Sequence, residues 1–257
     1  MKLEQKYKKI LSKIIKKGIY RNDRTKVGSY SLFNQSLNWN LSNNKFPMFT
    51  GKKIFKKIFE TEFKWFINGE TNIQRFKDAG VKIWNEWADE NGDLGPVYGH
   101  QLLSYNSEGI NQLDNVIISL KDNPDSRRHI ISLWNPLQIK DMALPPCYHY
   151  FQFFVKGNEL NMFVVQRSAD MFLGIPYDVA LFSRLLLYVA AKTNLKPCKI
   201  NLNMIDCHIY SNQIKQVETY IQNNLFEFPD YKYNTLEDKL KIFNYKSNSA
   251  IKAKVAV

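Results

Sequence analysis

The chain has 257 residues, of which 44% are hydrophobic and 14% aromatic, so we expect one large core in a single domain over residues 1–257. It contains no apolar run of about 18 residues and its N-terminus is amphipathic, so we expect neither a membrane span nor a secretory leader, but a soluble cytoplasmic protein. The net charge of +12 favours anionic partners such as nucleotides, polyglutamylated cofactors or nucleic acid.

The N-terminal quarter predicts two helices separated by short strands. Over residues 3–17, lysines alternate with apolar residues at helical spacing, which indicates an amphipathic helix with a solvated basic face. Residues 21–28 are polar and turn-like, and residues 31–33 and 37–41 alternate as strands do. Residues 53–66 predict a second helix, because apolar side chains recur there at steps of three and four.

The middle of the chain predicts a loop region followed by buried strands. Residues 84–99 are rich in Asp, Glu, Asn and Gly and are expected to form an ordered loop region, where catalytic groups commonly lie. Apolar runs predict strands over residues 130–134, 150–155 and 160–165. The last two strands are expected to form a hairpin through the turn at residues 157–158.

Two segments of the C-terminal part differ in regularity. The apolar run over residues 179–193 is too long for a strand and predicts a buried helix. Residues 226–249 are the least regular part of the sequence, and we expect an insertion or a loosely packed region there.

Cysteine and histidine usage argues for a reduced protein without a metal. Cys147, Cys198 and Cys207 are an odd number without paired spacing, so neither a disulfide framework nor a zinc site is expected. The four histidines form no metal-binding motif, and no metal site is predicted. A free thiol is then available for chemistry.

Cys147 is the candidate nucleophile. It follows two prolines, which restrict the backbone and remove amide donors near the thiol. A free cysteine can also be a small packing residue. Arg167, however, follows the second strand of the predicted hairpin and is expected beside the thiol, where a cation favours the thiolate. Addition of a thiolate to C6 of a pyrimidine makes C5 nucleophilic enough to attack an electrophile.

Glu62 is the candidate for proton transfer. Its neighbours four residues away, Ile58 and Phe66, are apolar, which places the carboxylate on the apolar side of the predicted helix. Burial there raises the pKa of a carboxyl group towards the range useful for proton transfer. A glutamate at the edge of the helix without a catalytic role is the alternative.

Motifs in the same order and with near-identical spacing resemble the thymidylate synthase family along nearly the whole chain. They run from residues 21–25 to residues 251–257 and include Leu-Pro-Pro-Cys at 144–147, Gln-Arg-Ser-Ala-Asp at 166–170 and Phe-Leu-Gly-Ile-Pro-Tyr-Asp at 172–178. The resemblance implies an α+β fold with a large mixed sheet, helices packed on one face and a homodimer interface on the other. It also implies methylenetetrahydrofolate as the cosubstrate that supplies a one-carbon unit.

The resemblance further implies roles for individual residues. The catalytic residues that it implies are Cys147, Glu62, Asp178, Tyr98 and Arg167. The residues implied to bind the nucleotide are Arg24, Arg127, Arg128, Arg167, Ser168, Asp170, Asp178, His208 and Tyr210. Of these, Arg127 and Arg128 are implied to reach the site of the partner subunit. The residues implied to bind the folate are Ile83, Trp84, Asp170, Leu173, Tyr177 and Val257.

One position departs from the family in a way that bears on the base. Asp178 stands where the family has an asparagine, whose amide matches the O4 acceptor and N3–H donor of uracil. Cytosine reverses this pattern. A protonated Asp178 offers O–H to N3 and C=O to the amino group, and an ionised Asp178 pairs with cytosine protonated at N3. Ionised Asp178 against O4 of uracil costs about 1–3 kcal/mol.

Aspartate at this position resembles the deoxycytidylate hydroxymethylases, relatives in bacterial viruses that add water instead of hydride to the exocyclic methylene. A viral protein of this kind would act in the host cytoplasm. Tyr148 follows the cysteine where synthases usually have histidine, which agrees with a changed base pocket. Leu102 and Leu103 replace a Trp-Arg pair, a change without an evident mechanism. Trp84 and the C-terminal tail, with which the synthases exclude water, are both present.

The leading hypothesis is therefore an enzyme that converts deoxycytidylate, methylenetetrahydrofolate and water to 5-hydroxymethyl-deoxycytidylate and tetrahydrofolate. One alternative is a thymidylate synthase acting on deoxyuridylate in which the asparagine was lost by drift. Another is an enzyme that methylates deoxycytidylate at C5. A nucleic-acid-binding protein that kept only the fold is a fourth, but no RNA- or DNA-binding motif supports it.

Overall fold

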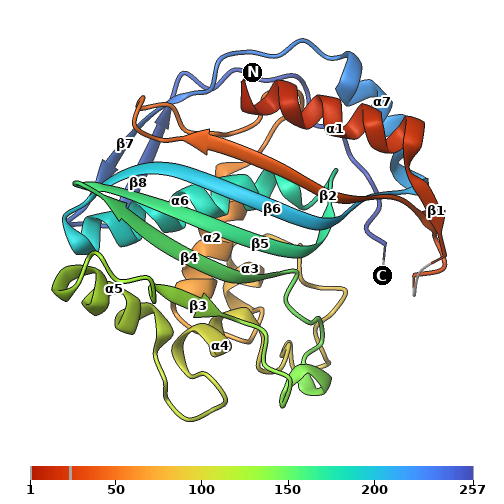
Figure 1. Ribbon diagram of the computed structural model, residues 1–257. Coiled ribbons are helices and arrows are strands. Elements are labelled where there is room, and N and C mark those ends of the chain that lie inside the picture. Colours follow the sequence, from red (N-terminus) through yellow and green to blue (C-terminus); the bar gives the residue numbers. More distant parts are fainter. Residues whose placement is uncertain (1, 23–24, 257) are drawn as a thin grey trace.

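The centre of the computed structural model, which describes residues 2–22 and 25–256, is a six-stranded sheet (Figure 1). Its strands are β1 (Ile19–Arg21), β2 (Ser29–Asn40), β3 (Ile130–Ser132), β4 (Tyr148–Lys156), β5 (Glu159–Asp170) and β6 (Lys196–Tyr210). Their order in the sheet is β1-β2-β6-β5-β4-β3. Strands β5 and β6 are parallel and the other neighbours are antiparallel, so the sheet is mixed, as predicted.

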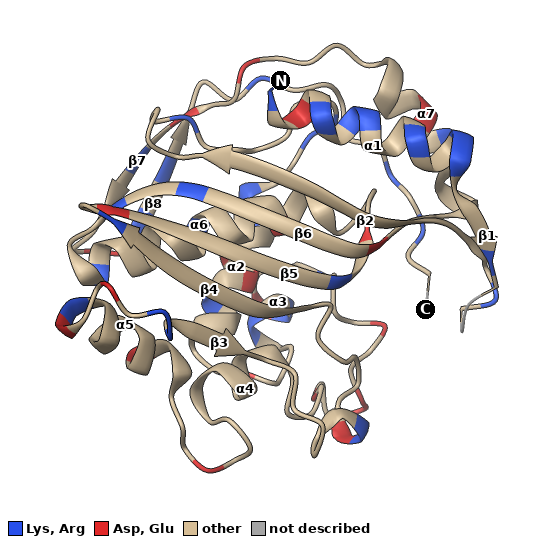
Figure 2. Cartoon of the chain, viewed as in Figure 1, with Lys and Arg blue, Asp and Glu red and all other residues tan. Residues whose placement is uncertain are grey.

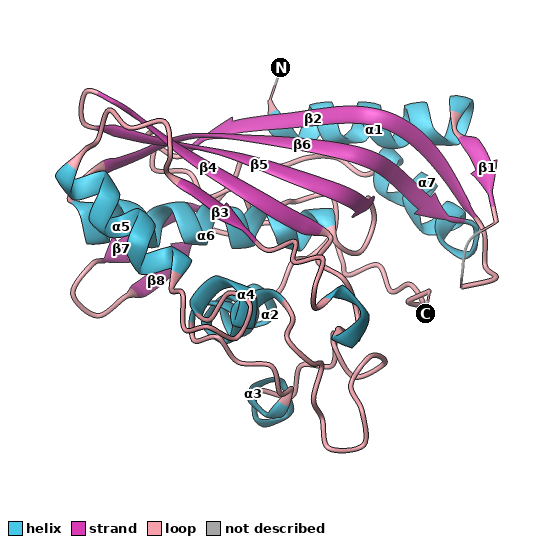
Figure 3. Cartoon of the chain, turned by 60° about the horizontal axis from the view of Figure 1, so that its bottom comes forward, coloured by secondary structure: helices cyan, strands magenta, loops and turns pink. Residues whose placement is uncertain are grey.

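Helices cover one face of this sheet. They are α1 (Leu3–Lys17), α2 (Lys56–Ile67), α3 (Gln74–Asp78), α4 (Tyr98–Leu103), α5 (Gln112–Asp122), α6 (Ile175–Thr193) and α7 (Ile214–Gln222), with short 3₁₀ turns at Ile139–Asp141 and Ser211–Gln213. Helices α2, α4, α5 and α6 lie on the same side of the sheet (Figure 3). Helix α6 connects the parallel strands β5 and β6, so it packs against the sheet and most of it is buried. The described residues include no helix long and apolar enough to cross a membrane.

On the other face of the sheet, apolar side chains are exposed to solvent in the part of the chain that the structure describes. Phe151 and Phe153 of β4 are buried. Phe154, the next residue along the strand, points to the opposite face and is 63% exposed. In β5, Phe163 is 40% exposed and lies opposite Gln152 in the register. Because residues opposite each other across antiparallel strands share a face, the exposed side chains of β4 and β5 form one open surface.

Most of the predicted elements are confirmed in type, with shifted ends. Residues 31–33 and 37–40 belong to one strand, β2, because the chain passes Asn34, whose φ is +50°, and continues in the same register with β6. Leu41, the last residue of the second predicted strand, lies beyond its end. The turn between β4 and β5 lies at Gly157, whose φ of +60° favours glycine. The lysines of α1 follow its outer side, as expected for a solvated face (Figure 2).

Residues 226–249, for which an insertion or a loosely packed region was expected, contain more regular structure than their sequence indicated. This segment contains a second sheet of two strands, β7 (Asp230–Asn234) and β8 (Lys239–Phe243). The hairpin is held by Arg184 of α6, which is fully buried and contacts Asp238 at 2.5 Å. The guanidinium also lies 4.1 Å from the ring centre of Phe63 in α2. The hairpin is thus stabilised by a contact between Asp238 and Arg184, which lies 54 positions earlier in the chain. Local sequence patterns do not reveal such a contact.

Candidate active site

A cavity of about 670 Å³ opens where β5 and β6 end and α6 begins. It is also bordered by α2, the start of α4 and the C-terminal tail. The residues of the predicted site that line it are Glu62, Ile83, Trp84, Tyr98, Cys147, Arg167, Ser168, Asp170, Leu173, Tyr177, Asp178, His208 and Tyr210. The fold therefore brings together predicted site residues that are up to 148 positions apart in the sequence, from Glu62 to Tyr210.

Two predicted site residues lie elsewhere, and for two others the structure gives no position. Arg24 and Val257 are outside the described residues. Arg127 and Arg128 are exposed in the connection between α5 and β3 and do not line the cavity. Their position is next to the edge strand of the sheet rather than at the ends of β5 and β6.

The parallel pairing of β5 and β6 explains why polar residues meet at this point. Ser168 lies opposite Asp206 and Asp170 lies opposite His208 in the register. Asp170 Oδ1 accepts hydrogen bonds from the backbone amides of Phe172 and Leu173, both at 2.9 Å. These bonds turn the chain sharply after β5, so that α6 begins beside the cavity.

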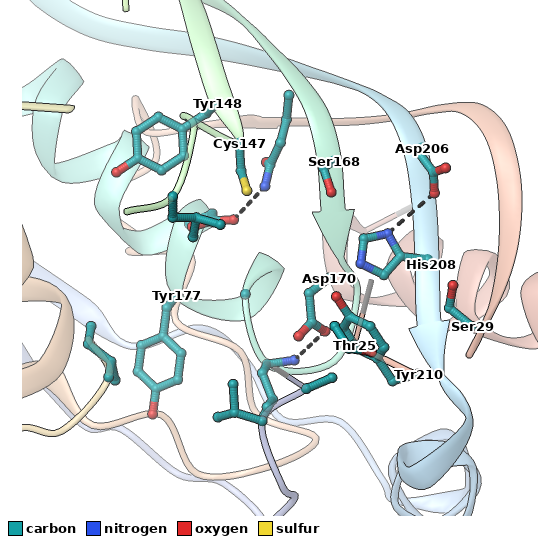
Figure 4. A pocket seen from close by; sticks show the side chains of 18 of the residues that line it. Thr25, Ser29, Cys147, Tyr148, Ser168, Asp170, Tyr177, Asp206, His208 and Tyr210 are labelled. Atoms are coloured by element: carbon teal, nitrogen blue, oxygen red, sulfur yellow. Dashed lines mark hydrogen bonds and ion pairs between the residues drawn. The ribbon is translucent and has the colours of Figure 1, made fainter. Parts of the chain in front are cut away.

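Cys147 is fixed through its backbone. Its amide donates to the hydroxyl of Tyr98 at 2.9 Å, and its carbonyl accepts from the amide of Arg167 at 2.8 Å. The Arg167 guanidinium donates to the carbonyls of Pro146 (2.9 Å) and Pro145 (2.7 Å). Figure 4 shows Cys147 on the side of the cavity opposite His208. These backbone bonds position the sulfur, which also has a side-chain hydrogen bond with Tyr98.

The protonation state of Cys147 differs from the simple expectation. Burial raises the pKa of the Cys147 thiol above its ordinary value, and the cation of Arg167 offsets this effect only in part. The prediction that Arg167 lies beside the thiol and favours the thiolate is correct in direction. Desolvation of the charged form is the larger effect, so the cavity favours the thiol over the thiolate.

Two carboxyl groups in the cavity have raised pKa values. Burial, together with the charge of Asp178, raises the pKa of Glu62 to about 8. Burial also raises the pKa of Asp178 to about 6, against the stabilising hydrogen bond from Gln166. At pH 7, Glu62 is therefore mostly protonated and Asp178 mostly ionised. The burial of Glu62 on the apolar side of its helix is confirmed, since the residue is 7% exposed.

Replacing Glu62 by glutamine is expected to stabilise the fold increasingly as pH rises. The folded protein binds this proton more tightly than the unfolded chain, so the wild type loses stability between the ordinary pKa of 4.5 and about 8. The difference in the free energy of unfolding should grow by on the order of 3–5 kcal/mol over this range. Urea unfolding at pH 5 and pH 8 measures it. The exposed Glu90→Gln is the control, and a difference independent of pH would contradict the argument.

Opposite the thiol, a polar cluster surrounds His208. Its ring donates from Nδ1 to Asp206 at 3.3 Å, and Asp206 also accepts from the hydroxyl of Ser31 at 2.6 Å. Burial opposes protonation, but the contacts with Asp206 and Asp170 raise the pKa of His208 overall. Figure 4 shows Asp206, His208 and Tyr210 together on this side. The raised pKa favours protonation of the ring, and the cluster presents hydrogen-bond donors to a ligand.

Sequence reasoning left other lining residues without a role. Gln166 donates from Nε2 to Asp178 Oδ2 at 2.9 Å. The alternation of β5 contained this signal, because Gln166 lies two residues before Ser168 and so on the same face. Trp87 and Ala256 also line the cavity, but neither carries a pattern in the sequence that distinguishes it from a packing residue.

The sequence model of the family described as "Thymidylate synthase" matches residues 5–257. The match covers all the elements from which the cavity is built.

Proposed function

This chain belongs to the thymidylate synthase family, and we propose that within it the chain hydroxymethylates deoxycytidylate at C5. Enzymes of the family transfer a one-carbon unit from methylenetetrahydrofolate to C5 of a pyrimidine nucleotide. The proposal concerns which base is bound and whether water or hydride completes the transfer.

The observation that carries the proposal is the environment of Asp178. Gln166 Nε2 donates to Oδ2, and no other side chain or amide of residues 2–22 and 25–256 donates to the carboxylate, which leaves Oδ1 for a ligand. With a pKa of about 6, Asp178 can share one proton with N3 of cytosine near neutral pH while accepting from the amino group. Ionised Asp178 instead repels O4 of uracil.

The remaining groups support covalent addition to the base. In the proposed reaction, Cys147 Sγ forms a bond to C6 as the thiol loses its proton, and C5 becomes the nucleophile. Glu62 is held protonated near neutrality in the same cavity, so it can exchange protons with the ring while the sulfur is attached. In the proposed complex, the phosphate and sugar of the nucleotide are bound by four residues that line the cavity, Arg167, Ser168, His208 and Tyr210.

The cavity also fits the folate that the family implies. A flat aromatic ring system needs apolar walls, and Ile83, Trp84, Leu173 and Tyr177 supply them. Asp170 uses Oδ1 for the turn after β5, so its other oxygen remains for a donor on the ligand. When bound, methylenetetrahydrofolate supplies the one-carbon unit.

We further propose that two chains associate through the open sheet face. That face exposes apolar side chains such as Phe154 and Phe163, a surface that a monomer in water would be expected to cover. Arg127 and Arg128 project from the adjoining edge, where they are exposed and outside their own cavity. A symmetric dimer would bring them to the phosphate site of the partner.

Co-expression of two inactive chains tests this arrangement. The Arg127→Ala/Arg128→Ala chain keeps its cysteine, and the Cys147→Ala chain keeps both arginines. If the arginines act across the interface, mixed dimers contain one complete site, and random pairing of equal amounts restores about a quarter of the wild-type sites. Activity that stays at the level of the separate chains would show that the arginines serve their own subunit or none.

Product analysis distinguishes the candidate functions. The protein is incubated with methylenetetrahydrofolate and equal amounts of deoxycytidylate and deoxyuridylate, and the masses of the nucleotide products are determined by mass spectrometry. A deoxycytidylate product heavier by CH₂O supports the proposal. Thymidylate as the product would identify a synthase that tolerates Asp178. Two residues favour this outcome, because Trp84 and the tail residue Ala256 line the cavity, as expected for a site that excludes water. Methylated deoxycytidylate would leave the base assignment intact and overturn the hydration step.

A further inference from the structure

Tyr148 carries a buried hydroxyl without a partner. The residue begins β4 directly after Cys147 and is 3% exposed. Its ring is packed among other aromatic rings, with centroids 4.7 Å from Tyr98 and 5.1 Å from Phe182. Among the described residues, none forms a hydrogen bond with its hydroxyl oxygen. The ring is held firmly while its polar end is unsatisfied.

A buried hydroxyl without a hydrogen bond destabilises the folded protein. Phenylalanine would fill the same aromatic surroundings without this cost, so packing alone does not account for a tyrosine. The hydroxyl must find its partner in a state that contains water or ligand, and Tyr148 lines the cavity of about 670 Å³ in which either can be present.

The groups around the hydroxyl indicate what that partner is. The titratable groups that face it are Glu62 of α2, Tyr98 of α4, Asp178 of α6 and the thiol of Cys147. The Oε1 atom of Gln166, which also lines the cavity, is buried without a hydrogen bond as well. A buried hydroxyl without a partner that faces two carboxyl groups is suited to a water molecule, which needs two to four polar neighbours.

We propose that Tyr148 is a positioning residue that holds, together with Glu62, the water molecule that adds to the one-carbon unit on C5. This inference rests on the proposed function, because it concerns the step that separates hydroxymethylation from reduction. The phenol can accept one hydrogen bond from the water and donate another, which orients a lone pair of the water oxygen towards the reacting carbon.

The proposed step is balanced in atoms and electrons. After tetrahydrofolate has left, the nucleotide carries an exocyclic methylene at C5 and the sulfur of Cys147 at C6. Glu62, which is protonated before the reaction, gives its proton to the nitrogen of tetrahydrofolate as that group leaves. The water oxygen then forms a bond to the methylene carbon and gives one proton to the resulting carboxylate of Glu62. The electron pair of the exocyclic double bond moves towards C5, re-forms the C5–C6 double bond and expels Cys147 as thiolate. No oxidant or reductant is required.

The test is Tyr148→Phe, which removes the hydroxyl and keeps the ring. Two quantities are measured on deoxycytidylate: release of the C5 hydrogen as tritium, and formation of the hydroxymethyl product. We expect product formation to fall about tenfold or more while tritium release changes by less than about threefold. Added 2-mercaptoethanol should then trap the exposed methylene as a thioether, in greater yield than with the wild type.

Tyr231→Phe is the matched control, because it removes a tyrosine hydroxyl that bonds to the Leu41 carbonyl outside the cavity. An equal fall of tritium release and product in Tyr148→Phe, or no change in either, would overturn the inference. A Tyr148→Phe chain that fails to fold would also overturn it, because the hydroxyl would then be structural. Wild-type protein that makes no hydroxymethyl product would refute the proposed function first.

Discussion

Replacement of Cys147 by alanine is expected to abolish turnover, by at least about 10⁴-fold, while leaving nucleotide binding largely intact. The sulfur is the group that adds to C6, and no other cysteine lines the described cavity. The backbone bonds that place this residue, to the Tyr98 hydroxyl and from the Arg167 amide, do not involve the side chain. The variant should therefore keep the shape of the cavity.

Turnover is followed by mass spectrometry of the nucleotides, and binding by calorimetry with deoxycytidylate. Cys198→Ala is the control, because Cys198 is a buried cysteine of β6 away from the cavity and its loss removes a thiol without touching the chemistry. Residual turnover of Cys147→Ala above a few per cent would rule out the covalent mechanism.

Replacement of Asp178 by asparagine is expected to shift the preference from deoxycytidylate to deoxyuridylate. The ratio of kcat/KM for the two nucleotides should change by about 10²–10⁴-fold, because one donor and one acceptor are exchanged in a buried site and each mismatch costs about 1–3 kcal/mol. The oxygen of the new amide can still accept from Gln166, and its NH₂ group can then donate to O4 of uracil.

Both nucleotides are assayed with the wild type and the variant under identical conditions. Asp122→Asn is the matched control, because it makes the same change of charge at an exposed position outside the cavity. If Asp178→Asn leaves the ratio unchanged, the base is recognised by other residues and the assignment of deoxycytidylate loses its support.

Local sequence patterns were sufficient for the features that depend on one element. The spacing of apolar residues around Glu62 predicted its burial and hence the direction of its pKa shift, and both are confirmed. The apolar runs at residues 150–155 and 160–165 predicted β4, β5 and the turn between them. In these segments, the residues that decide the structure lie within a few positions of one another.

Features that depend on distant contacts were not predicted. The hairpin of β7 and β8 depends on Arg184, and that pairing with Asp238 has no local signature. The protonated thiol of Cys147 reflects the degree of desolvation in the assembled cavity, which outweighs the charge of Arg167. The unpartnered hydroxyl of Tyr148 is likewise visible only after every neighbouring side chain has been placed.

The position of β6 in the sheet has a consequence for how the chain folds. This strand, residues 196–210, lies between β2 and β5 and pairs with both, so Ser29 pairs with Tyr210, 181 positions later in the chain. Contacts of such separation make folding slow, because a long loop must close before they form. Until β6 leaves the ribosome, β2 and β5 have unpaired edges that can pair with other chains. Correct folding therefore requires that these edges do not pair with other chains before β6 has been synthesised. A truncated chain that lacks β6 is expected to aggregate and to have no activity.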